Sequence, residues 1–283
     1  MTPACIKITT DERERSRMKI IVAIKQVPER DAHLGINSSG KWIDESDLQY
    51  AMNEPDAYAL EEALQLKEKH GGEVIVLSAG PERAGQTIRE ALAKGADRAI
   101  HIRCDDLPGR DALGVARLLA AAIRPESPDL VLTGLQSEDL GLGQTGVIAA
   151  ELLGLPHASL ILQVEKTGSG LKVKRELEEG WFQSIELPTP AVLTIQSGGN
   201  KLRYATLMGI KRAKTKEVRV LNAADLDAAD VDAADLGTAG GPVVTLDSVT
   251  MPRKQKSTQI LDGSAKEAAA ALVEKLKFEA RVL

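Results

Sequence analysis

Aromatic residues are scarce in this chain of 283 residues, at 2% of the sequence. Proteins that bind single-stranded nucleic acid without sequence preference stack the bases on aromatic side chains, so this scarcity argues against that class. The net charge of -5 at pH 7 argues further against nucleic acid, because the phosphate backbone selects basic protein surfaces. No nucleic-acid partner is therefore expected.

The sequence also lacks the patterns of metal and disulfide sites. Its two cysteines, Cys5 and Cys104, lie far apart without a CxxC spacing, and its four histidines form no HxxH or HxxxH pair. Protein metal sites that can be recognised from sequence use such close spacings. We expect no metal site and two reduced thiols, as is typical of a cytoplasmic protein.

Long apolar runs are absent as well. No run approaches the ~20 residues that span a bilayer. Residues 11–15 are all charged (DERER), and no apolar stretch of signal-peptide length precedes them, which argues against a secretory signal. We expect residues 1–17 to be a disordered extension, or to precede a natural start at Met18, and we expect a cytoplasmic location.

Motifs of bond-making chemistry are likewise missing. The sequence suggests no Ser-His-Asp or Cys-His arrangement and contains no GxxxxGK[ST] loop, the signatures of covalent hydrolases and of P-loop nucleotide hydrolases. The chain therefore suggests a binding protein without catalytic residues of its own, rather than an enzyme.

Strand-like and helix-like segments alternate through the first half of the chain. Strands are predicted at residues 19–27, 73–78, 98–102 and 129–133. Helices are predicted at 53–70, after Gly80-Pro81 through residues 87–92, and at 111–123 and 144–153. Asn53 is the expected N-cap of the first helix, and Gly71 its expected end. Strands separated by helices of this length form βαβ units, so we predict a doubly wound, mostly parallel sheet that binds its ligand beyond the carboxyl ends of the strands.

The pattern changes after Leu155. Shorter strands are predicted at residues 158–164, 171–177, 181–187 and 191–195, with turns at 168–170 and 179–180, as an antiparallel extension of the same sheet. Beyond Leu221 the biased stretch AADLDAADVDAADL is expected to be an exposed linker. An alanine-rich helix at 264–281 follows. We expect a domain at 18–221 and a linker with a helical arm at 222–283.

A glycine-rich loop at residues 134–146 lies between a predicted strand and a predicted helix, and residues 141–146 match GxGxxG. Glycines let a backbone approach a phosphate, and the start of the following helix offers free amides. The loop follows the last parallel strand rather than the first, so a nicotinamide-dependent enzyme is disfavoured. A purely structural turn stays open as an alternative. Small Ala23 lies in the second half of the strand predicted at 19–27, and small Ala79 ends the next strand. Both leave room for a flat base.

A family resemblance becomes recognisable at residues 173–216. Its landmarks are Arg175 with the Glu178-Glu179-Gly180 turn, the prolines 188 and 190, Asn200, the run RYAT at 203–206 and the basic run at 211–216. This segment resembles the signature of the β subunit of electron-transfer flavoproteins. The start KIIVAIKQVP, Glu61-Glu62-Ala63 and the run GADR at 95–98 are similar too, so that the likeness covers residues 18–221.

The resemblance implies a Rossmann-like fold, related to adenine-nucleotide α-hydrolases, in a heterodimer whose larger α subunit holds most of a redox-active FAD. The β subunit buries an AMP. By position, the AMP pocket of the family falls on Ala23, Asn53, Glu54, Pro55, Asp56, Ala79, Gly134, Leu135, Gln136, Ser137, Glu138, Asp139, Leu140, Gly141, Leu142, Gly143, Gln144 and Thr145. This chain has Gly143 where many members have Asn, and Pro28-Glu29-Arg30 where many have a Tyr beside the flavin.

The resemblance also implies partners. A recognition segment whose leucine anchors in acyl-CoA and related dehydrogenases falls on Leu207, flanked by Arg203, Tyr204 and Met208. An exposed Leu207 on a polar loop suits docking; internal packing of this leucine is the alternative. The implied function is electron transfer from such dehydrogenases to a membrane quinone reductase. A bifurcating β subunit with a second FAD instead of AMP, and a universal-stress-type adenine-nucleotide protein, are the other hypotheses.

Overall fold

The computed structural model describes residues 17–168, 170–229, 242–252 and 258–283. They belong to two compact units, Met1–Val249 and Thr250–Leu283. The expected disordered extension lies outside the described residues except for Arg17, and so does Cys5. Most of the expected linker, from residue 230 to 241, also lies outside them.

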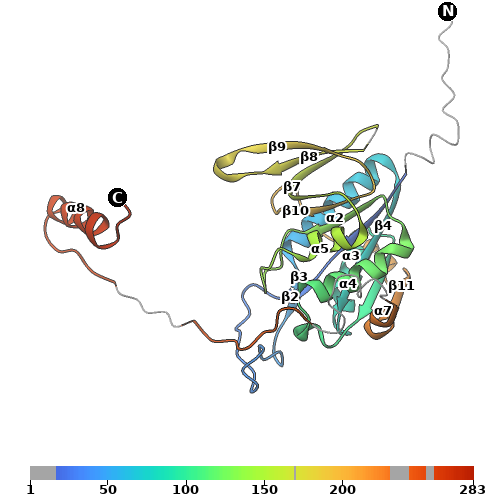
Figure 1. The fold of residues 1–283 in the computed structure, drawn as a ribbon, viewed down its shortest axis with the longest axis horizontal. Helices are drawn as coiled ribbons and strands as arrows, with labels where there is room; N and C mark the ends of the chain where they lie inside the picture. Colours follow the sequence, from blue (N-terminus) through green and yellow to red (C-terminus); the bar gives the residue numbers. More distant parts are fainter. Residues whose placement is uncertain (1–16, 169, 230–241, 253–257) are drawn as a thin grey trace, which may run out of the picture. The chain divides into compact units, whose positions relative to one another are not determined.

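The first unit alternates strands and helices through most of its length (Figure 1). The order is β1 (Met18–Ala23), β2 (Gln26–Pro28), β3 (Tyr50–Met52), α2 (Glu54–His70), β4 (Gly72–Gly80), α3 (Ala84–Lys94), β5 (Arg98–Arg103), α4 (Ala112–Ile123), β6 (Leu130–Gly134), α5 (Thr145–Leu153), β7 (His157–Lys166), β8 (Leu171–Glu176), β9 (Phe182–Leu187), β10 (Ala191–Ile195), α6 (Leu207–Ala213), β11 (Val218–Asn222) and α7 (Ala223–Ala229). The second unit contains α8 (Ala265–Glu274), which continues as a π-helical turn over Lys275–Glu279.

One sheet of nine strands organises the first unit. Its order is β11-β5-β4-β1-β6-β10-β7-β8-β9, and Figure 1 shows β9 and β11 at its opposite ends. All pairs from β11 to β7 are parallel, whereas β8 runs antiparallel to both β7 and β9. The predicted doubly wound, mostly parallel sheet with an antiparallel extension is confirmed.

Three expectations about strands are wrong. The expected strand at 19–27 ends at Ala23, and β2 pairs instead with β3 in a separate antiparallel sheet. Strand β10 does not belong to the antiparallel extension, because it lies parallel between β6 and β7. Strand β11 was not expected at all; it adds a parallel edge beside β5. The first two errors concern which neighbour a strand finds, and apolar periodicity carries no such information.

Helices cover both faces of the sheet. On one face, buried residues of α2, α3 and α6, among them Leu60, Ile88 and Ala213, pack on β1, β4 and β6. On the other, α4, α5 and α7 contribute residues such as Leu119 and Ala150. Helix α2 ends where expected, since Gly71 adopts a positive φ of 76° and its amide donates to Lys67 O at 2.7 Å.

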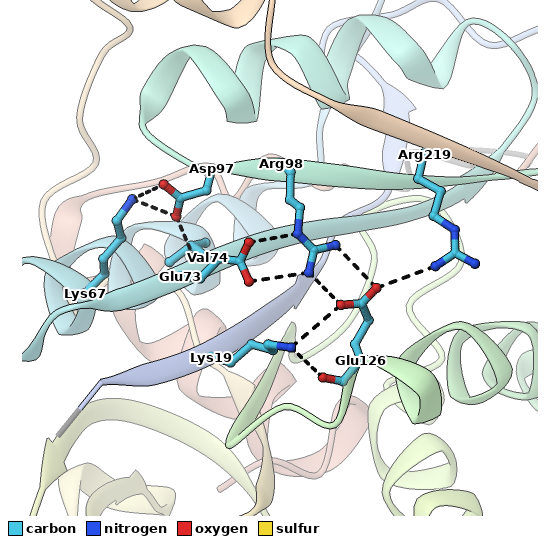
Figure 2. Close-up of polar contacts among 8 residues, drawn as sticks. All are labelled: Lys19, Lys67, Glu73, Val74, Asp97, Arg98, Glu126 and Arg219. Carbon is cyan, nitrogen blue, oxygen red and sulfur yellow. Dashed lines mark hydrogen bonds and ion pairs between the residues drawn. The ribbon is translucent and has the colours of Figure 1, made fainter. Parts of the chain in front are cut away.

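A polar network joins the amino ends of several strands (Figure 2). Arg98, which begins β5, donates through Nε to Glu73 Oε1 at 2.8 Å and through Nη2 to Glu126 Oε2 at 2.6 Å. Lys19 of β1 and Arg219 of β11 also contact Glu126. The hydrogen bonds from Arg98 hold the pKa of the Glu126 carboxyl below its usual value. These pairs connect the amino ends of the strands. The network therefore lies at the end of the sheet opposite to the predicted ligand site, which is at the carboxyl ends.

Candidate nucleotide site and docking segment

The candidate nucleotide site lies where the strand order reverses. From β1 the chain moves outward to β4 and β5 on one side, then returns to β6 on the other. Ligands of doubly wound sheets bind in the crevice at such a reversal, beyond the carboxyl ends. The ends of β1 and β6 meet there, with Ala23 opposite Thr133, and Ala79 lies near the end of neighbouring β4. Three segments of the predicted pocket therefore come together.

Asp56 bridges the two strands at this reversal. Its Oδ2 accepts a hydrogen bond from the amide of Lys25 at 2.7 Å, and its Oδ1 accepts one from the amide of Gly134 at 2.9 Å. The side chain is buried on the first turn of α2. Burial raises the pKa of Asp56 to about 7, although the hydrogen bonds from Lys25, Asn53 and Gly134 favour the ionised form. Asp56 thus ties the start of α2 to the ends of β1 and β6.

The raised pKa of Asp56 predicts a pH-dependent contribution to stability. Because the folded protein keeps a proton on Asp56 at pH values where the unfolded chain has lost it, wild-type stability falls as pH rises toward 7. An Asp56→Asn variant has no such proton. We expect the free-energy advantage of wild type over this variant to shrink between pH 5 and pH 8, as measured by urea unfolding. An advantage that stays constant or grows over that range would contradict the assignment.

Asn53 connects the start of α2 to the glycine-rich loop. It occupies the N-cap position, but its side chain makes no capping bond, which corrects the expected capping role. Its Nδ2 donates instead to Gln136 O at 3.0 Å, and its Oδ1 accepts from the amide of Glu138 at 2.9 Å. The loop is therefore hydrogen-bonded to α2 through one buried amide side chain.

The glycines of the loop meet two different requirements. Gly141 and Gly143 both have φ of 64°, in the left-handed region that disfavours other residues. Gly146 is needed for packing, because a methyl group there would lie 2.5 Å from Thr133 Oγ1 and 2.8 Å from Thr194 Cγ2. This last glycine brings α5 close to β6 and β10.

The start of α5 has the donors that an anion needs. Gln144 is the N-cap residue but makes no side-chain capping bond. Within the described part of the chain, the backbone amides of Leu142, Gly143, Gln144 and Thr145 donate to no protein acceptor. Free amides at a helix N-terminus bind phosphate, helped by the helix dipole. The residues present therefore fit the phosphate of a nucleotide.

The other predicted loop residues take varied positions. Leu135 donates its amide to Ile195 O at 2.9 Å, which joins the loop to β10. Leu140 and Leu142 are about half exposed at its tip. Glu138 and Asp139 pair with Arg30 and Lys25, two residues absent from the predicted site. Sequence reasoning missed them because both follow β1, far from the loop along the chain.

The predicted docking residues lie along a segment that α2 supports. Arg203 binds Glu61 through Nε at 2.7 Å and Glu68 through Nη1 at 2.6 Å, so its guanidinium is engaged within the chain. Next to it, Glu62 accepts from the amide of Val164 and from Asn200 Nδ2. Glu61 and Glu62 were part of the family resemblance, and the structure shows that they support residues 200–203.

Beyond Arg203 the segment is exposed. Tyr204, Leu207 and Met208 expose 92%, 88% and 58% of their surface, so internal packing of Leu207 is ruled out. Leu207 was expected in a loop, but it is the first residue of helix α6. The helix is capped by Thr206, whose Oγ1 accepts a hydrogen bond from the amide of Gly209 at 3.0 Å. Gly209 packs directly on Ala93 O of α3. The exposed side chains thus project from a helix that is fixed to the body.

The described residues also bear on metal binding and on membrane insertion. Among the described residues, no group of three or more His, Cys, Asp or Glu side chains is arranged to hold a metal ion. In the same part of the chain, no helix is both long and apolar enough to cross a membrane.

Comparison with known proteins gives a consistent result. The family model for the electron transfer flavoprotein domain matches residues 41–226. A relative named electron transfer flavoprotein subunit beta from Methylophilus methylotrophus is 40% identical over 267 residues, covering 91% of this chain and 97% of the relative. A subunit beta from Thermoanaerobacterium thermosaccharolyticum is 38% identical over 92% of this chain and 98% of its own length. A subunit beta from Oryza sativa subsp. japonica, named as mitochondrial, is 35% identical over 94% of this chain and 100% of its own length. The β1–β6 reversal with its glycine-rich loop and the exposed segment at the start of α6 are therefore features of a protein that belongs to the electron transfer flavoprotein family, as one of its β subunits.

Proposed function

We propose that this chain pairs with an electron-transfer flavoprotein α subunit, binds AMP in its own crevice and helps to hold an FAD that belongs mainly to the α subunit. The observation that carries the AMP assignment is the uncapped start of α5, where four consecutive amides from Leu142 to Thr145 lack a protein acceptor. FAD supplies the storage and release of electrons, while the residues of this chain bind, orient and recruit. No side chain of this chain performs bond chemistry in this proposal.

Features of the second unit favour the proposal that this chain has a partner chain. Helix α8 begins with a capping box in which Ser264 and Glu267 satisfy each other's backbone amides. None of its side chains is buried, and Leu272, Val273 and Phe278 expose 48%, 53% and 66% of their surface. A capped helix with exposed apolar residues gains stability by packing against another surface. We propose the α subunit as that surface.

The exposed residues of the docking segment suit a second, transient contact. Tyr204, Leu207 and Met208 are exposed large side chains close together in the sequence, and the bonds of Arg203 to Glu61 and Glu68 hold the segment that precedes them. We propose that acyl-CoA or related dehydrogenases dock there and that the electrons continue to a membrane quinone reductase. Membership of the electron transfer flavoprotein family sets aside the universal-stress-type alternative. A cytoplasmic location stays a prediction.

The test is the composition of the purified complex. We expect the chain, co-expressed with its α subunit, to purify as a yellow heterodimer that releases one AMP and one FAD on denaturation, identified by mass spectrometry. Two FAD per heterodimer and no AMP would replace this proposal with the bifurcating alternative. A stable, colourless homodimer would contradict both.

A further inference from the structure

The glycine-rich loop carries two carboxylates next to a proposed phosphate site. Glu138 and Asp139 would repel a bound phosphate if they faced it, because like charges at short range are destabilising. Both instead face cations from the segment after β1. Asp139 Oδ1 lies 2.7 Å from Lys25 Nζ, and Glu138 Oε1 lies 2.8 Å from Arg30 Nη2. The four side chains together have no net charge.

The first of these pairs is anchored in a fixed backbone. The amide of Lys25 donates to Asp56 at 2.7 Å, and its carbonyl accepts from the amide of Asn53 at 2.9 Å. The side chains of Lys25 and Asp139 are 36% and 21% exposed. Although burial opposes ionisation, the charge of Lys25 keeps the pKa of Asp139 below its usual value. Lys25 therefore holds one side of the loop from a backbone position that is hydrogen-bonded to the start of α2.

The second pair lies nearer the solvent. Arg30 Nη2 contacts Glu54 Oε2 at 2.6 Å as well as Glu138, so it joins the start of α2 to the loop. Its side chain is 74% exposed, which weakens each pair through solvent screening. Arg30 also lines a surface groove of about 380 Å³ with Val27, Ala51 and Glu54. The loop is thus held at two neighbouring positions by two cations of different exposure.

We infer that Lys25 and Arg30 form an electrostatic latch that holds residues 135–143 closed over the nucleotide and sets the rate at which it leaves. This inference rests on the proposed function. It gives Glu138 and Asp139 a role different from the one the family resemblance implies: their side chains dock the loop rather than contact the ligand. Lys25 and Arg30 are positioning residues, because they act through the loop.

Nucleotide release tests the latch in the intact heterodimer. The complex is loaded with radiolabelled AMP and chased with excess unlabelled AMP. Lys25→Met and Arg30→Met are each expected to speed release about threefold to fivefold, with the larger effect for Lys25 because its pair is less exposed. Raising NaCl from about 0.05 to 1 M should speed wild-type release, because salt screens the two ion pairs. The double variant keeps Glu138 and Asp139 without their cations, so added salt screens only the repulsion between these carboxylates and the phosphate and should not speed its release.

Lys67→Met is the matched control. Lys67 forms a pair of the same kind with Asp97, with Nζ 2.6 Å from Oδ1, at the opposite edge of the sheet (Figure 2). We expect it to lower the melting temperature without changing AMP release. Release from the double variant at the wild-type rate, in a complex that still holds AMP, would overturn the latch. Absence of AMP from the wild-type complex would instead overturn the proposed function on which the latch rests.

Discussion

Replacing Gly134 with valine should empty the nucleotide site and destabilise the first unit by about 3 kcal/mol. Even a methyl group at this position would collide with Asp56 Oδ1 and lie 2.8 Å from both Asp56 N and Pro55 Cβ. The start of α2 would have to move away from β6, which breaks the hydrogen bond between the Gly134 amide and Asp56. AMP content of the purified heterodimer and urea unfolding measure the two effects.

Gly85→Ala is the control for this substitution. Gly85 lies in α3, where an added methyl group meets no atom within 4 Å and no positive φ is required. Alanine in a helix is favoured over glycine by roughly 1 kcal/mol, so this variant should be as stable as wild type or more stable, with full AMP content. A Gly134→Val protein that keeps AMP and unfolds like wild type would show that the close approach of α2 to β6 is dispensable.

Arg203→Ala should cost about 2–4 kcal/mol of folding free energy and also slow electron transfer from a docked dehydrogenase. The substitution leaves Glu61, whose side chain is only 5% exposed, without its cationic partner. It also removes the guanidinium bonds to Glu61 and Glu68 that hold the segment next to Tyr204. Thermal unfolding measures the loss of stability. The slower electron transfer is measured as the rate of flavin reduction by a reduced acyl-CoA dehydrogenase, well below the melting temperature.

Two further variants separate support from direct docking. Arg203→Lys keeps the charge but cannot make the paired bonds of a guanidinium, so its stability should lie between those of wild type and Arg203→Ala. Leu207→Ala removes an exposed side chain and should slow reduction without lowering the melting temperature. If Arg203→Ala slowed reduction at unchanged stability, Arg203 would be a contact residue and not a support.

The sequence predicted the parts of the fold that depend on local patterns. The helix from Glu54 to His70 and its glycine end follow from apolar spacing and from the positive φ that Gly71 supplies. The neighbours of β10 do not follow, because five buried residues are compatible with a strand of either direction. The helix that begins at Leu207 could have been recognised from Thr206, a good N-cap before apolar residues three apart.

The candidate site was predicted to a similar extent. The loop and Asp56 were expected at one edge, and the structure brings them together there. The roles of individual side chains were not accessible, because they depend on partners distant in sequence: Asn53 binds a loop that lies 83 residues later, and Lys25 an aspartate that lies 114 residues later. Sequence spacing alone carries no information about such pairs.

The position of β10 has a consequence for synthesis on the ribosome. Strands β6 and β7 share no direct pairing, since β10 lies between them. Until residues 191–195 emerge, a nascent chain can form only two separate sheets, β5-β4-β1-β6 and the hairpin meander β7-β8-β9. The facing edges of β6 and β7 then stay open to wrong partners. The five buried residues of β10 pair with both open edges at once. The two partial sheets can therefore join into one sheet only after this short strand has been synthesised.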